Sequence, residues 1–261
     1  MLKRRLIFAL LWQKGAFWLS RNFRVSKAGN LGWLEKNYNF AVIADAIDEL
    51  VVLNVSREPG HMHDFAADVA ALCAGVFVPL TVGGGIRSLD DAALLLRNGA
   101  DKLLVNTPLY EESELVRELV ATYGSQCIVA SIDYKRTTTS TEVYSQQGAR
   151  GTGHSVETAV ARAVELGAGE ILLTSMDRDG TGQGYDLEVL RRVAATTSIP
   201  VIASGGVGNF EHLAAWLEDP LGTAACTANI FNFLGGGLRE ARDHIVSRGI
   251  PLATWEPGWR G

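Results

Sequence analysis

The sequence predicts an α/β protein that folds as a (β/α)8 TIM barrel, because eight short apolar runs alternate with amphipathic segments. The runs read LIFAL (6–10), ELVVLN (49–54), VPLTV (78–82), KLLVN (102–106), CIVASI (127–132), EILLTS (170–175), PVIA (200–203) and AACTA (224–228). Strands that are apolar on both faces belong in a parallel sheet covered by helices, and eight of them favour a closed barrel. The 261 residues suffice for one such barrel, so we expect a single domain over residues 1–261.

An internal repeat is the second observation that favours a closed barrel. The stretch ELVVLN…VPLTVGGGIRS resembles EILLTS…IPVIASGGVGN, with Glu49 matching Glu170 and Pro79 matching Pro200, each pair 121 residues apart. A repeat of about half the chain predicts two (β/α)4 halves related by a pseudo-two-fold axis. Features of one half should therefore recur across the barrel.

The ends of several helices can be placed from capping residues. Ser88, Asp186 and Asn209 precede amphipathic segments and are expected to be N-caps, whereas Gly124 follows such a segment and should end it. The segment 137–153 is rich in Thr, Ser, Gln and Gly. Its polarity predicts a long loop after the fifth strand.

Composition excludes several classes of protein. Lys and Arg number 24 against 29 Asp and Glu, a net charge of −5 without a basic run, so nucleic acid is not an expected partner. The opening KRRLIFALLW lacks a small-residue cleavage site after it, which favours a first strand over a signal peptide, and no apolar run approaches the ~18 residues of a membrane span. Three cysteines without CxxC spacing indicate reduced thiols and a cytosolic protein.

No metal or cofactor is expected from the residue pattern. His61 and His63 have no accompanying carboxylate or cysteine cluster, which favours surface-loop histidines over ligands.

Two glycine clusters follow strands and precede helices, where backbone N–H groups and a helix N-terminus suit a phosphate. Either cluster alone could be a tight turn, but two at the repeat distance favour a phosphorylated ligand with two anionic ends. The polar ends of the fourth and eighth strands are placed to complete the two cradles. The candidate binding residues are Gly84, Gly85, Asn106 and Thr107 in one half and Ser204, Gly205, Gly206, Ala228 and Asn229 in the other.

Two carboxylates are expected at the same end of the barrel, where catalytic groups of this fold cluster. Asp133 ends the fifth strand and is a candidate general acid or base. Asp179 follows the sixth strand in Asp-Gly-Thr, before Gly180, which is a further candidate phosphate-binding residue. It could serve as a second acid or base, or it could cap a turn and hold the phosphate loop.

Four charged residues stand at the opposite strand ends. Arg5, Glu49, Lys102 and Glu170 begin strands one, two, four and six. Charges of alternating sign that converge on one layer of the interior are costly unless they pair, so we expect a closed ring of salt bridges. The ring could stabilise the fold or serve a function.

These motifs resemble the cyclase subunit of imidazole glycerol phosphate synthase over nearly the whole chain. The matching stretches are PLTVGGGIRS, GADK, GSQCIV, GAGEILLTSMDRDGT, GYDLE and IPVIASGGVGN. The resemblance implies a synthase or lyase subunit of a glutamine amidotransferase, in which a glutaminase docked at the barrel's bottom supplies ammonia to a bisphosphate held at the top. It also implies that Arg5, Glu49, Lys102 and Glu170 form the ammonia gate and that Asp101 meets the glutaminase.

The chain departs from this family's pattern in one half of the pocket. The resemblance implies catalysis by two aspartates; one is Asp133, but the other falls at Leu11, which can carry no proton. A family phosphate-binding lysine falls at Leu19, the aspartate usual after strand two is Asn54, and positions around Gln147 are altered.

This combination resembles a paralogous branch of the family that works with a glutaminase and a sugar N-amidotransferase in surface polysaccharide synthesis. Our leading hypothesis is therefore an ammonia-channelling subunit for amidination of an amino sugar. Two alternatives stay open: a histidine-pathway cyclase with its second acid relocated, for example to Asp179, and a non-catalytic scaffold that activates a glutaminase.

Overall fold

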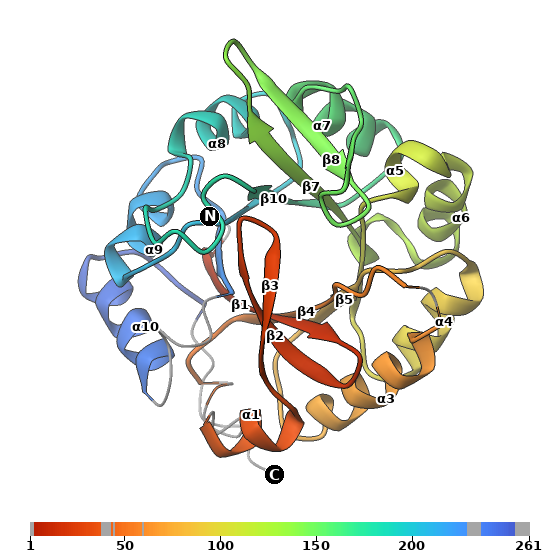
Figure 1. Ribbon diagram of the computed structural model, residues 1–261. Helices are drawn as coiled ribbons and strands as arrows, with labels where there is room; N and C mark the ends of the chain where they lie inside the picture. The colour runs from red at the N-terminus through yellow and green to blue at the C-terminus, as the bar shows by residue number, and fades with distance from the viewer. Residues whose placement is uncertain (1–2, 38–42, 44, 59, 229–235, 254–261) are drawn as a thin grey trace.

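Eight parallel strands close into a barrel (Figure 1), as the sequence predicts. The computed structural model describes residues 3–37, 43, 45–58, 60–228 and 236–253. Around the barrel the strands follow chain order, and closure comes from pairing of the last with the first. They are β1 (Arg5–Gln13), β4 (Glu49–Asn54), β5 (Leu80–Gly83), β6 (Lys102–Val105), β7 (Ile128–Arg136), β10 (Glu170–Ser175), β11 (Val201–Ser204) and β12 (Ala224–Thr227).

Helices surround the barrel on its outside (Figure 1). They are α1 (Leu31–Asn37), α3 (Met62–Cys73), α4 (Leu89–Arg97), α5 (Pro108–Glu111), α6 (Ser113–Tyr123), α7 (Val156–Glu165), α8 (Leu187–Ala194), α9 (Phe210–Leu217) and α10 (Gly237–Ser247), with a 3-10 turn at Ser125–Cys127. The expected caps are confirmed: the side chains of Ser88, Asp186 and Asn209 accept backbone N–H bonds at the starts of α4, α8 and α9. Gly124, at φ 84°, ends α6.

The alternation of β1 divides its side chains between two apolar layers. Leu6, Phe8, Leu10 and Trp12 are buried between the barrel and the helices, and Ile7 and Ala9 belong to a separate cluster in the barrel interior. Because side chains of a strand alternate between its faces, the inward series begins at Arg5 and reaches Leu11 at the top. One strand thus connects the two ends of the barrel interior.

The sheet register establishes which residues of the two halves are equivalent. Ile7 and Leu11 of β1 lie opposite Glu49 and Leu53 of β4. In the other half, Val129 and Asp133 of β7 lie opposite Glu170 and Thr174 of β10. Glu49 and Glu170 are the repeat-related pair, so the pseudo-two-fold axis places Leu11 where the other half has Asp133.

Two hairpins extend the barrel at its C-terminal end, and one of them corrects the prediction of a long loop. Residues 137–153 contain β8 (Thr141–Ser145) and β9 (Arg150–Gly151), which continue antiparallel from β7. The prediction was wrong because Thr141, Val143 and Ser145 are buried at alternate positions, a period-two pattern even though Thr141 and Ser145 are polar. The second hairpin, β2 (Ala16–Arg21) with β3 (Arg24–Gly29), pairs with β1 and was not anticipated.

The histidine pair also differs from its predicted place. His61 precedes α3, and His63 lies exposed in the first turn of that helix rather than in a loop. Among the described residues, none of the helices has the length and apolar character needed to traverse a bilayer.

Candidate functional site

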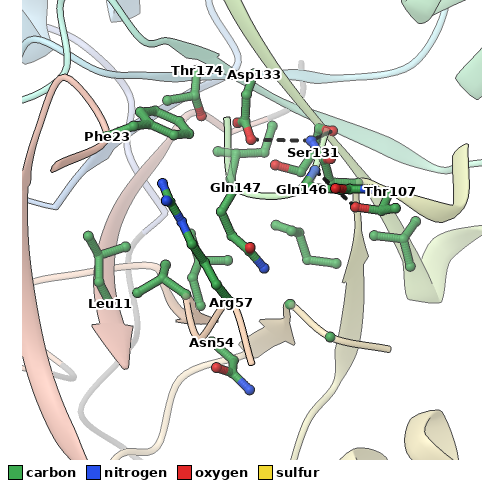
Figure 2. Close-up of a pocket in the computed structure, with 18 of the residues that line it drawn as sticks. Leu11, Phe23, Asn54, Arg57, Thr107, Ser131, Asp133, Gln146, Gln147 and Thr174 are labelled. Atoms are coloured by element: carbon green, nitrogen blue, oxygen red, sulfur yellow. Dashed lines mark hydrogen bonds between the residues drawn. The ribbon is translucent and has the colours of Figure 1, made fainter. Parts of the chain in front are cut away.

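A cavity of about 790 Å³ opens at the C-terminal ends of the barrel strands. Figure 2 shows Leu11 and Asn54 on one side of it and Asp133 and Thr174 on the other. Leu53 also lines it, next to Leu11 in the sheet. The two walls of the cavity therefore differ at equivalent positions: one presents the apolar side chains of Leu11 and Leu53, and the other the carboxyl group of Asp133 and the hydroxyl group of Thr174.

Asp133 is the buried acid of the cavity. Burial raises its pKa to about 7, the charge of Asp179 acts in the same direction, and side-chain hydrogen bonds with Ser131 and Thr174 oppose both. Asn106 Nδ2 lies 3.2 Å from Asp133 Oδ2 and also donates to the carbonyl oxygens of Ser131 and Tyr144. A carboxyl group that titrates near neutral pH can both give and take a proton in a reaction.

Asp179 lines the same cavity, but its carboxylate holds the tip of the β2–β3 hairpin. Its Oδ2 accepts from Ser20 Oγ at 2.5 Å and from the Phe23 N–H at 3.0 Å, and its carbonyl oxygen accepts from the Asn22 N–H at 2.9 Å. Burial raises its pKa, and the hydrogen bonds from the Ser20 hydroxyl and the Phe23 backbone N–H lower it. This carboxylate therefore holds the β2–β3 hairpin, a contact that the sequence did not predict. Its roles as a holder of the phosphate loop or as a second acid or base stay predictions.

The tip of the β8–β9 hairpin reaches over the cavity from the opposite side. Gln147 and Gly148 both have positive φ, 51° and 77°, with an N–H···O bond from Ala149 to Gln146 that closes a tight turn. A Cβ on Gly148 would clash with Met176 and Phe23. Gln147 Nε2 donates to the Ser56 carbonyl oxygen at 3.4 Å, so this tip contacts the loop after β4.

The two glycine loops have the backbone that the repeat predicts. Gly84 and Gly205 have φ of 91° and 89°, and a Cβ on either would strike the carbonyl oxygen of the preceding strand's end, Asn54 in one half and Ser175 in the other. Only a residue without a Cβ allows this close approach.

The cavity reaches the two glycine loops unequally. The candidate binding residues that line it are Gly84, Gly85, Asn106, Thr107, Ser204 and Ala228. Gly180, Gly205 and Gly206 do not line it, and Asn229 lies outside the described residues. Gly206 is covered because its carbonyl oxygen accepts from the Gly184 N–H at 2.7 Å and a Cβ there would meet Gly184.

The four charged residues at the opposite end form a closed ring, here called the floor ring. Arg5 bonds to Glu49 and Glu170 at 2.9 Å each, and Lys102 bonds to the same two carboxylates at 3.2 and 3.0 Å. Glu49 also accepts from Thr81 Oγ1 at 2.5 Å. The ion pairing expected from the sequence is thus present, whereas its role as an ammonia entrance stays a prediction.

Asp101 stands beside the floor ring, exposed at the start of β6. Its carboxylate accepts from the Leu80 N–H at 2.8 Å. Its contact with a glutaminase stays a prediction.

An apolar interior separates the floor ring from the cavity. The buried residues of this interior are Ile7, Ala9, Val51, Leu104, Val129, Leu172, Ile202, Ala224 and Cys226. The cavity descends as far as Ala9, Leu104, Leu172 and Cys226, which leaves one further layer above the floor ring. Two of the interior residues, Ala9 and Ala224, have small side chains.

Sequence reasoning missed Arg57, which lies in the loop after β4 and lines the cavity. Figure 2 shows its guanidinium extending into the cavity between Leu11 and Gln147. The repeat offset of 121 residues, which pairs Arg57 with Arg178, could have drawn attention to it. Leu19, in contrast, packs against the outer core and does not line the cavity.

A metal site is not evident in the part of the chain that the structure describes. That part holds no group of three His, Cys, Asp or Glu side chains arranged to bind an ion.

Comparisons with known proteins agree with the geometry. A family model described as histidine biosynthesis protein matches residues 37–237. A protein of Parasynechococcus marenigrum (strain WH8102), named provisionally as imidazole glycerol phosphate synthase subunit hisF2, is 39% identical over 256 residues, which cover 98% of this chain and 95% of the relative.

Proposed function

Because the chain belongs to the histidine biosynthesis protein family, as a relative of the synthase subunit of imidazole glycerol phosphate synthase, we propose that it receives ammonia from a glutaminase and delivers it through its barrel. Two observations together support this most. The floor ring is intact, and a leucine, Leu11, stands at the position equivalent to Asp133. The route is kept while the chemistry at its end has changed.

The floor ring acts as the entrance for ammonia. Its ion pairs separate the apolar interior from the solvent or partner below, and Glu49 is almost fully buried, with its side chain 2% exposed. Neutral ammonia enters the apolar layer of Ile7 and Val51 at far lower cost than charged ammonium, which would lose its hydration without compensation. The interior therefore delivers the nucleophilic, neutral form.

At the top of the barrel, Asp133 is the group that exchanges protons with the acceptor or the incoming ammonia. Asn106 Oδ1 is buried and has no hydrogen-bond partner among the described residues, so it is available to accept from an N–H of ammonia beside the Asp133 carboxyl. The glycine loops at Gly84 and Ser204 bind a phosphorylated acceptor between them. The two hairpin tips limit access of water from above.

The acceptor that fits this account is an amino sugar or its nucleotide conjugate, used in surface polysaccharide synthesis with a sugar N-amidotransferase as a further partner. With Leu11 in place of a second acid or base, the barrel positions ammonia and acceptor but lacks the paired proton transfer that ring closure by a cyclase needs. General acid–base groups contribute about 10²–10⁴-fold to rate, so their loss separates the two activities.

The test is a glutaminase assay with a glutaminase subunit encoded in the same genome. We expect the two chains to co-elute and this chain to raise glutamate formation from glutamine at least tenfold. The variant Glu170→Gln removes a carboxylate of the floor ring. Its matched control is Glu165→Gln, at an exposed position on α7. Absence of both a complex and stimulation would remove the proposal.

A second candidate, a cyclase of histidine biosynthesis, is supported by the retained Asp133 and the two glycine loops. In that case Asp179 supplies the second acid or base. Rapid turnover of the histidine-pathway bisphosphate with ammonia, abolished by Asp179→Asn but not by loss of its neighbour in Asp177→Asn, would establish it. Glutaminase stimulation without any ammonia-dependent product would instead indicate a scaffold.

A further inference from the structure

Arg57 and Arg178 occupy equivalent places in the two halves but have different surroundings. Arg57 follows the end of β4, and Arg178 follows the end of the repeat-related β10. The two arginines are 121 residues apart, the same separation as the repeat. Arg178 Nη1 donates to the carbonyl oxygens of Gln183 and Gly184 at 3.3 Å each, so it holds its own loop. Among the described residues, Arg57 has no hydrogen-bond or ion-pair partner, and it lines the cavity.

Carboxylates line the same cavity, but none of those in the described residues forms an ion pair with Arg57. The adjacent Glu58 bonds to Lys14 at 2.7 Å instead. Leu11 and Leu53 supply apolar wall beside it, and Asn54 is neutral, with its Oδ1 taken up by the Ser56 N–H. Arg57 is solvent-exposed at the mouth of the cavity, where its guanidinium is free to make a charge-assisted, bidentate hydrogen bond to an oxyanion.

The loop that carries Arg57 is held at a defined place. Gln147 Nε2 donates to the Ser56 carbonyl oxygen, one residue before Arg57, from the tip of the β8–β9 hairpin. The guanidinium lies between this glutamine and Leu11 (Figure 2). Gln147 is therefore a positioning residue for Arg57.

We infer that Arg57 is a specificity-determining residue that binds an oxyanion, a phosphate or a carboxylate, of the acceptor against the wall formed by Leu11 and Leu53. This inference rests on the proposed function and specifies its substrate class: an acceptor with an anionic group on the β1–β4 side of the cavity, apart from the glycine loops. On this side the protein binds the acceptor, and on the Asp133 side it transfers protons.

The experiment follows the arginine Nε–Hε resonances by NMR while inorganic phosphate, or separately acetate, is added to the full chain. Arg57→Lys identifies the Arg57 resonance by its absence. We expect a saturable shift of Arg57 and of the Gln147 side-chain amide, with Arg97, exposed on α4, unmoved. A response to phosphate alone indicates a phosphoryl group, and a response to acetate as well indicates that carboxylates are also accepted.

Variants separate this subsite from the glycine loops. In Arg57→Gln the anion response of the Gln147 amide should weaken at least tenfold, as expected for loss of a charged hydrogen bond. The phosphate response of the Gly84 and Gly85 N–H groups should persist, which shows that the variant is folded. Arg57→Lys should retain part of the response, and the control Arg97→Gln all of it. No saturable Arg57 shift with either anion, or an unchanged Gln147 response in Arg57→Gln, overturns the inference. Stimulation of the glutaminase is measured on the unaltered protein and on the control Arg97→Gln, so failure of the proposed function is read separately from loss of the Arg57 response.

Discussion

The two halves of the barrel share a backbone plan but differ in chemistry at equivalent positions. Leu11 and Leu53 of β1 and β4 occupy the places that Asp133 and Thr174 hold on β7 and β10. The glutamates below them, Glu49 and Glu170, are the same in both halves and share the floor ring. The difference teaches that the repeat is maintained at the glutamates of the floor ring and has diverged at the opposite end of the barrel, around the cavity.

The equivalent glutamates of the floor ring provide the largest expected effect on stability. Glu49→Gln should lower the free energy of unfolding by about 3 kcal/mol, because it leaves Arg5 and Lys102 short of a buried counter-charge. Glu170→Gln should cost less, since its side chain is 14% exposed against 2% for Glu49 and lacks the Thr81 bond. Urea denaturation of both variants measures this, with exposed Glu165→Gln as the control. Equal losses would show that burial does not distinguish the two halves.

The buried acid of the β7 half should make stability depend on pH in a way that its leucine counterpart cannot. The folded pKa of Asp133, about 7, lies above its unfolded value, so the folded state retains a proton that the unfolded state has lost. Stability from this group is therefore fully present below pH ~4, declines as pH rises through 7, and is then constant.

Asp133→Asn should remove this dependence. From pH 4 to pH 8, the free energy of unfolding of the variant should rise relative to that of the unaltered protein by on the order of 2–4 kcal/mol. Urea unfolding at both pH values measures this. Leu11→Asn is the matched variant in the other half and should show no such gain with pH. A parallel response of the two variants would contradict a raised pKa at Asp133.

Asp179 and Glu58, a third equivalent pair, predict the smallest effects. Asp179 accepts from Ser20 in a part-buried contact, so Ser20→Ala should cost about 1 kcal/mol of stability and loosen the β2–β3 hairpin. Lys14→Ala removes the exposed partner of Glu58 and should cause no measurable change. Thermal unfolding and hydrogen exchange at Phe23 measure both. Equal protection of the Phe23 N–H in the two variants would contradict a holding role for Asp179.

Local patterns predicted much of this molecule, because strand alternation and capping depend on near neighbours. Ser88, for example, bonds to an N–H three residues away. The floor ring followed from strand starts that a closed barrel must bring together. The hairpin at Thr141 was missed because two of its three buried residues, Thr141 and Ser145, are polar. The part of Asp179 was left open because Ser20 lies 159 residues away in the chain. Arg57 was missed because its importance lies in having no partner, which only the folded structure reveals.

The most direct measurement compares ammonia-dependent turnover of the histidine-pathway bisphosphate by the unaltered protein and by Leu11→Asp. The account predicts that the unaltered protein turns over slowly and that an aspartate facing Asp133 raises the rate by about 10²-fold or more. Leu53→Asp, one strand along in the same cavity, should not reproduce the gain. Rapid turnover by the unaltered protein, with no increase in Leu11→Asp, would contradict the claim that the β1 half of the pocket has lost its proton-transfer role.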